Sequence, residues 1–203
     1  MEPRQRKDLR LKGYDYASNG VYHVTICTYQ KTPWLSRIVG AATCRPQPNL
    51  EDPQPNLEDP QPNLEDPQPN LEDPQPNLED PQPNLEVQLT EYGQAIEKAI
   101  RNIPGIYCFI RIKNFVIMPN HVHLLLHFKF PDSMKKRPTL SIVVNQLKRY
   151  ASMQAGHTLW QRSFHDNIIN NRAEYESTMH YIDSNPANWP NDDFYVTLDY
   201  LQS

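Results

Sequence analysis

Residues 106–130 read IYCFIRIKNFVIMPNHVHLLLHFKF, and this stretch is the starting point for the fold. Two runs rich in β-branched and aromatic residues, 106–118 and 121–130, flank the dipeptide Pro119-Asn120. Such runs are typical of β-strands, and proline followed by asparagine is typical of a turn. The stretch therefore predicts a β-hairpin.

Segments on both sides of this hairpin predict further strands and helices. Residues 21–29 (VYHVTICTY) are expected to form a strand, and a short strand near 35–39 is expected to pair with 87–89. Apolar residues at helical spacing predict a helix over 90–102 that Pro104-Gly105 ends. A second amphipathic helix takes its apolar face from Leu140, Val143, Val144, Leu147, Tyr150 and Ala151.

A last helix is expected over residues 172–185. Asn171 with Glu174 three residues later is typical of a helix start, and Pro186 ends the segment. The order strand, helix, strand, strand, helix, helix favours an α+β fold, with helices packed on one face of an antiparallel sheet. A ferredoxin-like arrangement is the natural candidate.

A tandem repeat of Pro-Gln-Pro-Asn-Leu-Glu-Asp occupies residues 46–86. Its two prolines per unit exclude a coiled coil, and its composition predicts an extended, polyproline-like or disordered segment. A binding role is one interpretation, and a tandem expansion tolerated in a surface loop is the simpler one. We therefore expect a single domain formed by residues 1–45 and 87–203, with 46–86 as a disordered insertion.

The charge of the chain is unevenly distributed. The repeat holds 11 of the 24 acidic residues and none of the 20 basic ones. The rest of the chain therefore has 20 basic and 13 acidic residues, a net charge of +7. This balance favours a polyanionic partner, nucleic acid first, although solvated surface charge alone also produces it.

Cysteine usage and hydropathy indicate the compartment. Three widely spaced cysteines without a Cys-x-x-Cys pair predict neither a disulfide framework nor a cysteine zinc site. No apolar run approaches the length of a membrane span, and the charged N-terminus lacks the apolar stretch of a signal peptide. A cytoplasmic protein without a membrane partner is expected.

The hairpin also carries the strongest chemical signal, His121 and His123. On a strand, residues i and i+2 project from one face, so both imidazoles lie side by side while Val122 points to the other face. Two neutral imidazoles at this spacing can chelate a divalent ion. They also suit an exposed polar face, and oxygenases, hydrolases and cupin-like proteins share the His-x-His pattern.

A second pair of residues lies on the last predicted helix. Tyr181 and Asn185 stand at i and i+4 and so leave one face of the helix. An asparagine carbonyl would supply a third metal ligand, and a tyrosine hydroxyl would supply a nucleophile for a phosphate. Packing in the core is the alternative role for one of 11 tyrosines.

Four segments in this order resemble a known family: MPNHVHLLL (118–126), SIVVNQLKRYAS (141–152), LWQRSFHDNIINN (159–171) and HYIDSNPANW (180–189). They are similar to the REP-associated tyrosine transposases and the related insertion-sequence-200-like transposases, which are single-tyrosine HUH enzymes. The N-terminal stretch RLKGYDYASNGVYHVTICTYQ (10–30) also looks like the opening strand of such proteins.

The resemblance implies a metal-dependent nuclease and strand transferase that acts on single-stranded, hairpin-forming DNA. It assigns Tyr181 as the nucleophile of a 5′-phosphotyrosine intermediate, and His121, His123 and Asn185 as ligands of Mg²⁺ or Mn²⁺. No nucleotide cofactor is expected. The protein is expected to be a monomer or a homodimer, because in dimeric relatives the partner subunit can supply the tyrosine helix.

Further residues are assigned by charge or by comparison with the family. Phosphate contacts are expected from Arg10, Lys12, Lys148, Arg149 and Arg162, although a Lys-Arg pair on a helix is more often only solvated. Trp160 and Phe164 would either stack on an unpaired base or lie in the core. His165 stands where the family commonly has tyrosine or another aromatic residue, and we expect it to face solvent or to be satisfied in the core.

Two other functions are compatible with the same residues. One is a DNA-binding protein of the same fold that has lost cleavage and acts as a repressor or structural factor. The intact set His121, His123, Tyr181 and Asn185 argues against it. The other is an unrelated metalloenzyme that acts on a small molecule. The basic net charge outside the repeat argues against it, as does the absence of a third histidine or carboxylate near His121 and His123.

Overall fold

The computed structural model describes residues 11–39 and 86–195, and a four-stranded antiparallel sheet forms its centre. The sheet has the order β4-β5-β1-β6 and consists of β1 (Gly20–Cys27), β4 (Ile110–Ile117), β5 (His121–Phe128) and β6 (His165–Ile169). Helix α1 (Glu91–Ile106) links β1 to β4, and α2 (Leu140–Ala155) links β5 to β6. This order and connectivity are those of a ferredoxin-like sheet, so the predicted α+β fold class is confirmed.

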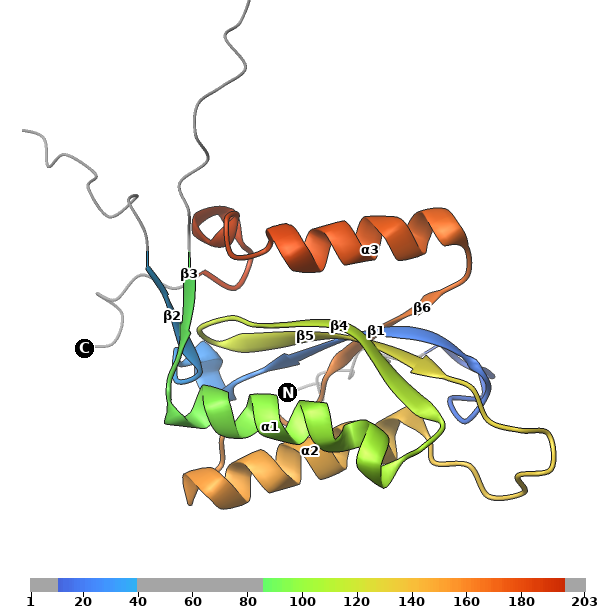
Figure 1. The fold of residues 1–203 in the computed structure, drawn as a ribbon. Coiled ribbons are helices and arrows are strands. Elements are labelled where there is room, and N and C mark those ends of the chain that lie inside the picture. The colour runs from blue at the N-terminus through green and yellow to red at the C-terminus, as the bar shows by residue number, and fades with distance from the viewer. Residues whose placement is uncertain (1–10, 40–85, 196–203) are drawn as a thin grey trace, which may run out of the picture. The chain divides into compact units, whose positions relative to one another are not determined.

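The helices lie on both faces of this sheet. Helices α1 and α2 cover one face, as expected, whereas α3 (Arg172–Ser184) runs across the opposite face, over β4 and β5 (Figure 1). The face under α3 carries polar side chains, among them His23, Thr25, His121 and His123, which α1 and α2 could not bury in an apolar core. Helix α3 and the sheet therefore enclose a polar layer.

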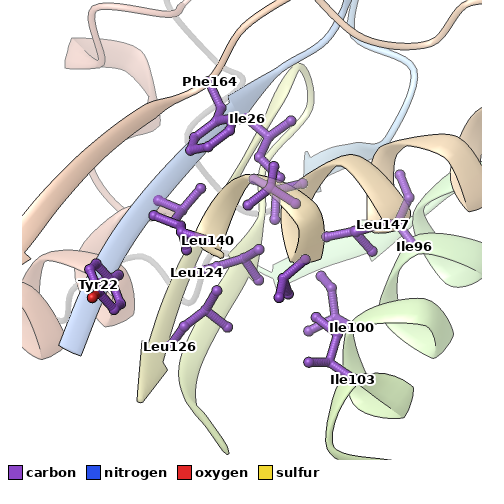
Figure 2. Packing of buried hydrophobic residues seen from close by; sticks show 14 of the residues in the cluster. Tyr22, Ile26, Ile96, Ile100, Ile103, Leu124, Leu126, Leu140, Leu147 and Phe164 are labelled. Atoms are coloured by element: carbon purple, nitrogen blue, oxygen red, sulfur yellow. The ribbon is translucent and has the colours of Figure 1, made fainter. Parts of the chain in front are cut away.

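The apolar core lies between the sheet and the helices α1 and α2. Alternate residues of the strands, such as Ile26, Leu124 and Leu126, point toward Ile100 and Leu147 of the helices (Figure 2). Burial of a side chain of this size contributes about 1.5–3 kcal/mol. The core thereby fixes the opposite, polar face of the same strands.

A short two-stranded sheet stands between β1 and α1. Strand β2 (Ser36–Val39) pairs antiparallel with β3 (Glu86–Leu89), from Ser36 opposite Leu89 to Val39 opposite Glu86, which confirms the predicted pairing. The repeat connects these strands, and all of it but Glu86 lies outside the described residues. A single domain interrupted at 46–86 remains our proposal for the domain organisation.

Three details differ from the sequence-based expectation. Helix α1 continues through Pro104-Gly105 to Ile106, because a proline in the last turn removes one hydrogen bond without ending the helix. On α2, Lys148 is buried together with the apolar residues, whereas Tyr150 is 40% exposed. The edge strand β6 was not predicted, because HDNII is short and half polar. None of the described helices is long and apolar enough to span a bilayer.

Gly93 offers a stringent test of how α1 packs on the chain before β2. A Cβ atom at this position would lie 2.1 Å from the backbone oxygen of Leu35, which cannot move aside as a flexible side chain can. We expect Gly93→Ala to lower the free energy of unfolding by about 3 kcal/mol or more, at the upper end of overpacking effects. Urea unfolding followed by circular dichroism measures the change.

The matched control is Gly105→Ala in the same helix. The nearest atom to its added Cβ is Asn102 Oδ1 at 3.1 Å, the end of a side chain that can rotate. Alanine favours a helix over glycine by about 1 kcal/mol, so this variant should be neutral or more stable. Equal destabilisation by both substitutions would contradict the close approach at Gly93.

Candidate active site

Strand β5 presents the two histidines toward α3. His121 is fully buried and His123 is 2% exposed, and their ring centroids lie 4.7 Å apart. Val122 between them points into the apolar core and is also fully buried. The alternation expected for a strand therefore holds, and it places both imidazoles in the polar layer.

Helix α3 brings Tyr181 to the same place within one chain. The helix begins at a reciprocal cap, in which Asn171 Oδ1 accepts from the Glu174 amide (2.9 Å) and Glu174 Oε1 accepts from Asn171 Nδ2 (2.7 Å). Buried Ile182 anchors its inner side. Tyr181 Oη then lies 3.5 Å from His123 Nε2, while 44% of the tyrosine remains exposed.

The structure adds Asp192, which sequence reasoning missed. Its Oδ2 lies 3.9 Å from His121 Nε2 and accepts a hydrogen bond from Asn185 Nδ2 (3.3 Å). The potential ligand atoms of His121, His123 and Asp192 all lie within 4.8 Å of one another. Asp192 follows the short helix η3 (Trp189–Asn191) in a segment without periodicity, so no pattern in the sequence pointed to it.

His23 is a second neighbour that sequence reasoning did not connect to the site. Its Nε2 lies 3.2 Å from His123 Nδ1, and Thr25 Oγ1 lies 3.0 Å from the same nitrogen. The expectation that the histidine pair has no third histidine or carboxylate nearby is therefore wrong. Strand pairing explains the difference, because Thr25 of β1 stands directly opposite His123 of β5.

Two buried atoms in this cluster have no hydrogen-bond partner within the described part of the chain: His121 Nε2 and Asn185 Oδ1. Asn185 uses its Nδ2 to donate to Asp192, so the unpaired atom of its amide is the oxygen, an acceptor. An unpaired buried polar atom costs about 1–3 kcal/mol. Acceptors that converge with a carboxylate are what a divalent cation requires, so these residues fit a metal ion.

Burial keeps the three imidazoles uncharged. It lowers the pKa of His121 to about 4 and that of His23 to about 4. Burial and the two neighbouring histidines lower the pKa of His123 to about 2. Neutral imidazole is the form that coordinates metals. The histidines are therefore ready to bind a cation at neutral pH without first losing a proton.

The pKa of the Tyr181 hydroxyl is shifted in the opposite direction. Burial and the nearby carboxylate of Asp192 raise the pKa of Tyr181 above its ordinary value. The hydroxyl is therefore a phenol at neutral pH in the metal-free protein, and its use as a nucleophile requires a positive charge at the cluster. Beside it is a cavity of about 180 Å³, lined by Asn188, Asp193 and Phe194 together with Tyr181, Asn185 and Asp192.

The lowered histidine pKa values predict acid sensitivity of the metal-free protein. Below pH 6.5 these three histidines bind protons in the unfolded chain, whereas in the folded chain they stay neutral down to about pH 4 or lower. The free energy of unfolding should therefore fall as the pH drops from 7 to 5, by up to about 1.4 kcal/mol per pH unit for each of the three histidines. Urea unfolding in EDTA measures this slope.

A substitution at His23 tests this assignment. His23→Gln should reduce the slope, because one of the imidazoles whose pKa is lowered by burial is lost. A free energy of unfolding that stays constant between pH 7 and pH 5 would contradict the burial of neutral imidazoles.

The remaining predicted residues lie apart from this cluster. Lys148 is 9% exposed, and its Nζ donates to the backbone oxygens of Gln161 and Ser163 (3.0 Å), so its ammonium is already bonded within the fold, and its phosphate contact stays a prediction. Lys12, Arg149 and Arg162 are exposed, and Arg10 lies outside the described residues. Trp160 and Phe164 are both buried in the core rather than open for stacking.

The chain is similar to known proteins in sequence and in structure. No family model matches the chain. A protein from Haemophilus influenzae (strain ATCC 51907 / DSM 11121 / KW20 / Rd), described only as uncharacterized, is 25% identical over 212 residues that cover 94% of this chain and 93% of the relative. The structure of the REP-associated tyrosine transposase bound to a REP hairpin is 16% identical, with a TM-score of 0.48 over 93% of this chain and 74% of that chain.

Proposed function

We propose that this protein is a metal-dependent transposase of the single-tyrosine HUH kind, which nicks single-stranded, hairpin-forming DNA and rejoins it. One observation carries the proposal: Tyr181 Oη lies 3.5 Å from His123 Nε2, at the open side of a buried cluster of acceptor atoms. The motifs shared with the family assign the same residues these roles. Cleavage, rather than binding alone, explains why a nucleophile stands beside a cation site.

The residues that would hold the cation are His121, His123, Asp192 and the side-chain oxygen of Asn185. A bound Mg²⁺ or Mn²⁺ would polarise a phosphate oxygen and neutralise the charge that develops during substitution. Asp192 and Asn185 supply oxygen ligands of the kind both ions prefer, and the imidazoles suit Mn²⁺ better than Mg²⁺.

Tyr181 performs the covalent step. Its Oη forms a bond to phosphorus while the bond from phosphorus to the 3′ oxygen breaks. The phenol proton is replaced by the phosphoryl group, and the departing 3′ oxygen gains a proton, so a 5′-phosphotyrosine and a free 3′-OH result. Because the phosphodiester energy is conserved in the new bond, the same 3′-OH or another can reverse the step without a nucleotide cofactor.

A nicking assay tests this function directly. The full chain is incubated with a labelled single strand that carries a hairpin and flanking bases, in Mn²⁺, Mg²⁺ or EDTA. Metal-dependent formation of a denaturation-resistant adduct is expected with the fragment 3′ of the cut, which is attached to the protein through its 5′ phosphate. Binding that is equal in EDTA and in metal, without any adduct, would favour the alternative of a repressor or structural factor that has lost cleavage.

A small-molecule metalloenzyme is disfavoured by the size of the cavity beside Tyr181. Its volume of about 180 Å³ is below the roughly 300–1,000 Å³ of ordinary ligand pockets. The tyrosine stands partly exposed at this cavity, which suits a reaction on a polymer that lies across the surface.

Neighbouring cations on α2 should differ in their effect on DNA binding. Arg149→Met is expected to weaken single-strand binding and to reduce the salt dependence of the affinity by about 0.7 in log-log slope, with no change in stability. Lys148→Met should instead destabilise the fold by about 1–3 kcal/mol, because two backbone oxygens lose their donor. Fluorescence anisotropy at several salt concentrations, together with thermal melts, separates the two effects.

A further inference from the structure

We propose that Asn120 is a positioning residue, which fixes the proton of His121 on Nδ1 and so turns the lone pair of Nε2 toward the cluster of acceptors. The same side chain holds the segment that carries Asp192. Asn120 thereby organises two ligands of the cation site at once. The inference deepens the proposed function and rests on it only where metal affinity is concerned.

The orientation of the Asn120 amide follows from its hydrogen bonds. Asn120 is fully buried in the turn between β4 and β5. Its Nδ2 donates to two backbone oxygens, that of Lys31 at 3.1 Å and that of Phe194 at 2.7 Å. An amide oxygen could make neither bond, because both partners are acceptors. Oδ1 is therefore the atom that faces His121.

This orientation decides the tautomer of His121. Asn120 Oδ1 lies 2.9 Å from His121 Nδ1, and since the amide oxygen only accepts, Nδ1 must carry the hydrogen. In a neutral imidazole the other nitrogen then has a free lone pair. That nitrogen, Nε2, is the buried atom without a partner in the described chain, 3.9 Å from Asp192 Oδ2. Asn120 thus leaves His121 prepared to bind a cation.

The second role of Asn120 concerns the segment after η3. Its bond to the Phe194 oxygen attaches this segment to the turn two residues beyond Asp192. Lys31 reinforces the attachment, since its Nζ donates to the Asp193 oxygen at 3.2 Å and lies 4.9 Å from the centre of the Phe194 ring. Loss of the Asn120 amide would therefore loosen Asp192 as well as His121.

The backbone at Lys31 supports this assignment. Gln30 and Lys31 both have a positive φ, 55° and 56°, which is the left-handed region that such side chains rarely adopt. A residue held there costs on the order of 1–3 kcal/mol and persists where its surroundings hold it in place. Here the Lys31 oxygen is directed at Asn120 Nδ2, so the strained turn completes the set of acceptors that orients the amide.

His123 provides an internal contrast. Its Nδ1 faces Thr25 Oγ1 at 3.0 Å and His23 Nε2 at 3.2 Å. A hydroxyl and a neutral imidazole can each donate or accept, so these neighbours do not dictate where the proton of His123 lies. We therefore expect a fixed tautomer for His121, whereas either tautomer is compatible with the neighbours of His123.

The test is the tautomer of His121 in the full-length, metal-free protein. Long-range ¹H–¹⁵N NMR spectra of the imidazoles distinguish the protonated from the unprotonated nitrogen, and the spectrum of His121→Gln identifies the signals of His121. We expect one tautomer with the proton on Nδ1. A proton on Nε2, or a mixture of tautomers, in the wild-type protein would overturn the proposal.

The variant Asn120→Ala extends the test to function. It should give a mixture of His121 tautomers and weaken Mn²⁺ binding, measured by titration calorimetry, by about 10–100-fold, as is usual when a residue behind a ligand is lost. The control Thr28→Val removes a buried hydroxyl that donates to the Asn120 backbone oxygen at 3.0 Å, but it leaves the amide in place. It should lower thermal stability and leave the tautomer and Mn²⁺ affinity unchanged.

Unchanged tautomer and Mn²⁺ affinity in Asn120→Ala would refute the positioning role. The outcome is distinct from failure of the proposed function. A wild-type protein that forms no adduct with DNA, yet shows the fixed tautomer and loses Mn²⁺ affinity in Asn120→Ala, would refute nicking and support the role of Asn120.

Discussion

Tyr181→Phe is expected to abolish the covalent adduct with DNA and to lower the rate of strand cleavage by at least about 1,000-fold. The substitution removes only the hydroxyl whose oxygen lies 3.5 Å from His123 Nε2. The phenyl ring keeps its place against His123, so the fold and the binding of DNA should be unaffected. Adduct formation on a denaturing gel and single-turnover cleavage of a labelled strand measure the effect.

The control for this variant is Tyr175→Phe, six residues earlier on the same helix. It removes a hydroxyl from α3 without approaching the cluster, and it should retain full activity. Undiminished adduct formation by Tyr181→Phe would show that another residue is the nucleophile. Equal loss in both variants would show that α3 as a whole, rather than the Tyr181 hydroxyl, is required.

Removal of a ligand of the cation site is expected to lower strand cleavage about as much as Tyr181→Phe does. In the wild-type protein, Mn²⁺ at 100 times its dissociation constant should stabilise the fold by about 2.7 kcal/mol. In a chain of this size, about 1 kcal/mol corresponds to roughly 2–4 °C in Tm, so a rise of several degrees is expected. His121→Ala should lose both this rise and strand cleavage, because the fully buried imidazole supplies the unpaired Nε2.

His127→Ala is the matched control for the metal experiment. His127 lies on the same strand and, by alternation, on the same face as His121, but at the other end of β5. It should keep the rise in Tm with Mn²⁺ and the cleavage activity. If His121→Ala retained the rise with Mn²⁺, the cation would bind elsewhere in the protein.

Local patterns in the sequence were sufficient for the parts of the site that belong to regular elements. Strand alternation placed His121 and His123 on one face, and helical spacing placed Tyr181 and Asn185 on another. The approach of these two faces depends on α3 crossing the sheet on the side away from α1 and α2. No local pattern encodes that crossing.

Residues that long-range contacts position could not be predicted in this way. Asp192 belongs to an irregular segment, and His23 joins the site only through the register of β1 with β5. For Lys148, by contrast, a local pattern does predict the observed position. It stands four residues after Val144 and three before Ala151, both buried, so the helical period itself places it on the covered side of α2.

The end of the two-stranded sheet has a practical consequence. Because Val39 and Glu86 pair directly, the chain leaves and re-enters the domain at adjacent points, whatever the length between them. Loop closure costs only about 0.6 kcal/mol more for each doubling in length, so variants with more or fewer repeat units should be nearly as stable as this chain. The same junction is a suitable insertion site for a fluorescent protein or an affinity tag, because it lies at the opposite end of β2 and β3 from Ser36 and Leu89, which join them to the rest of the fold.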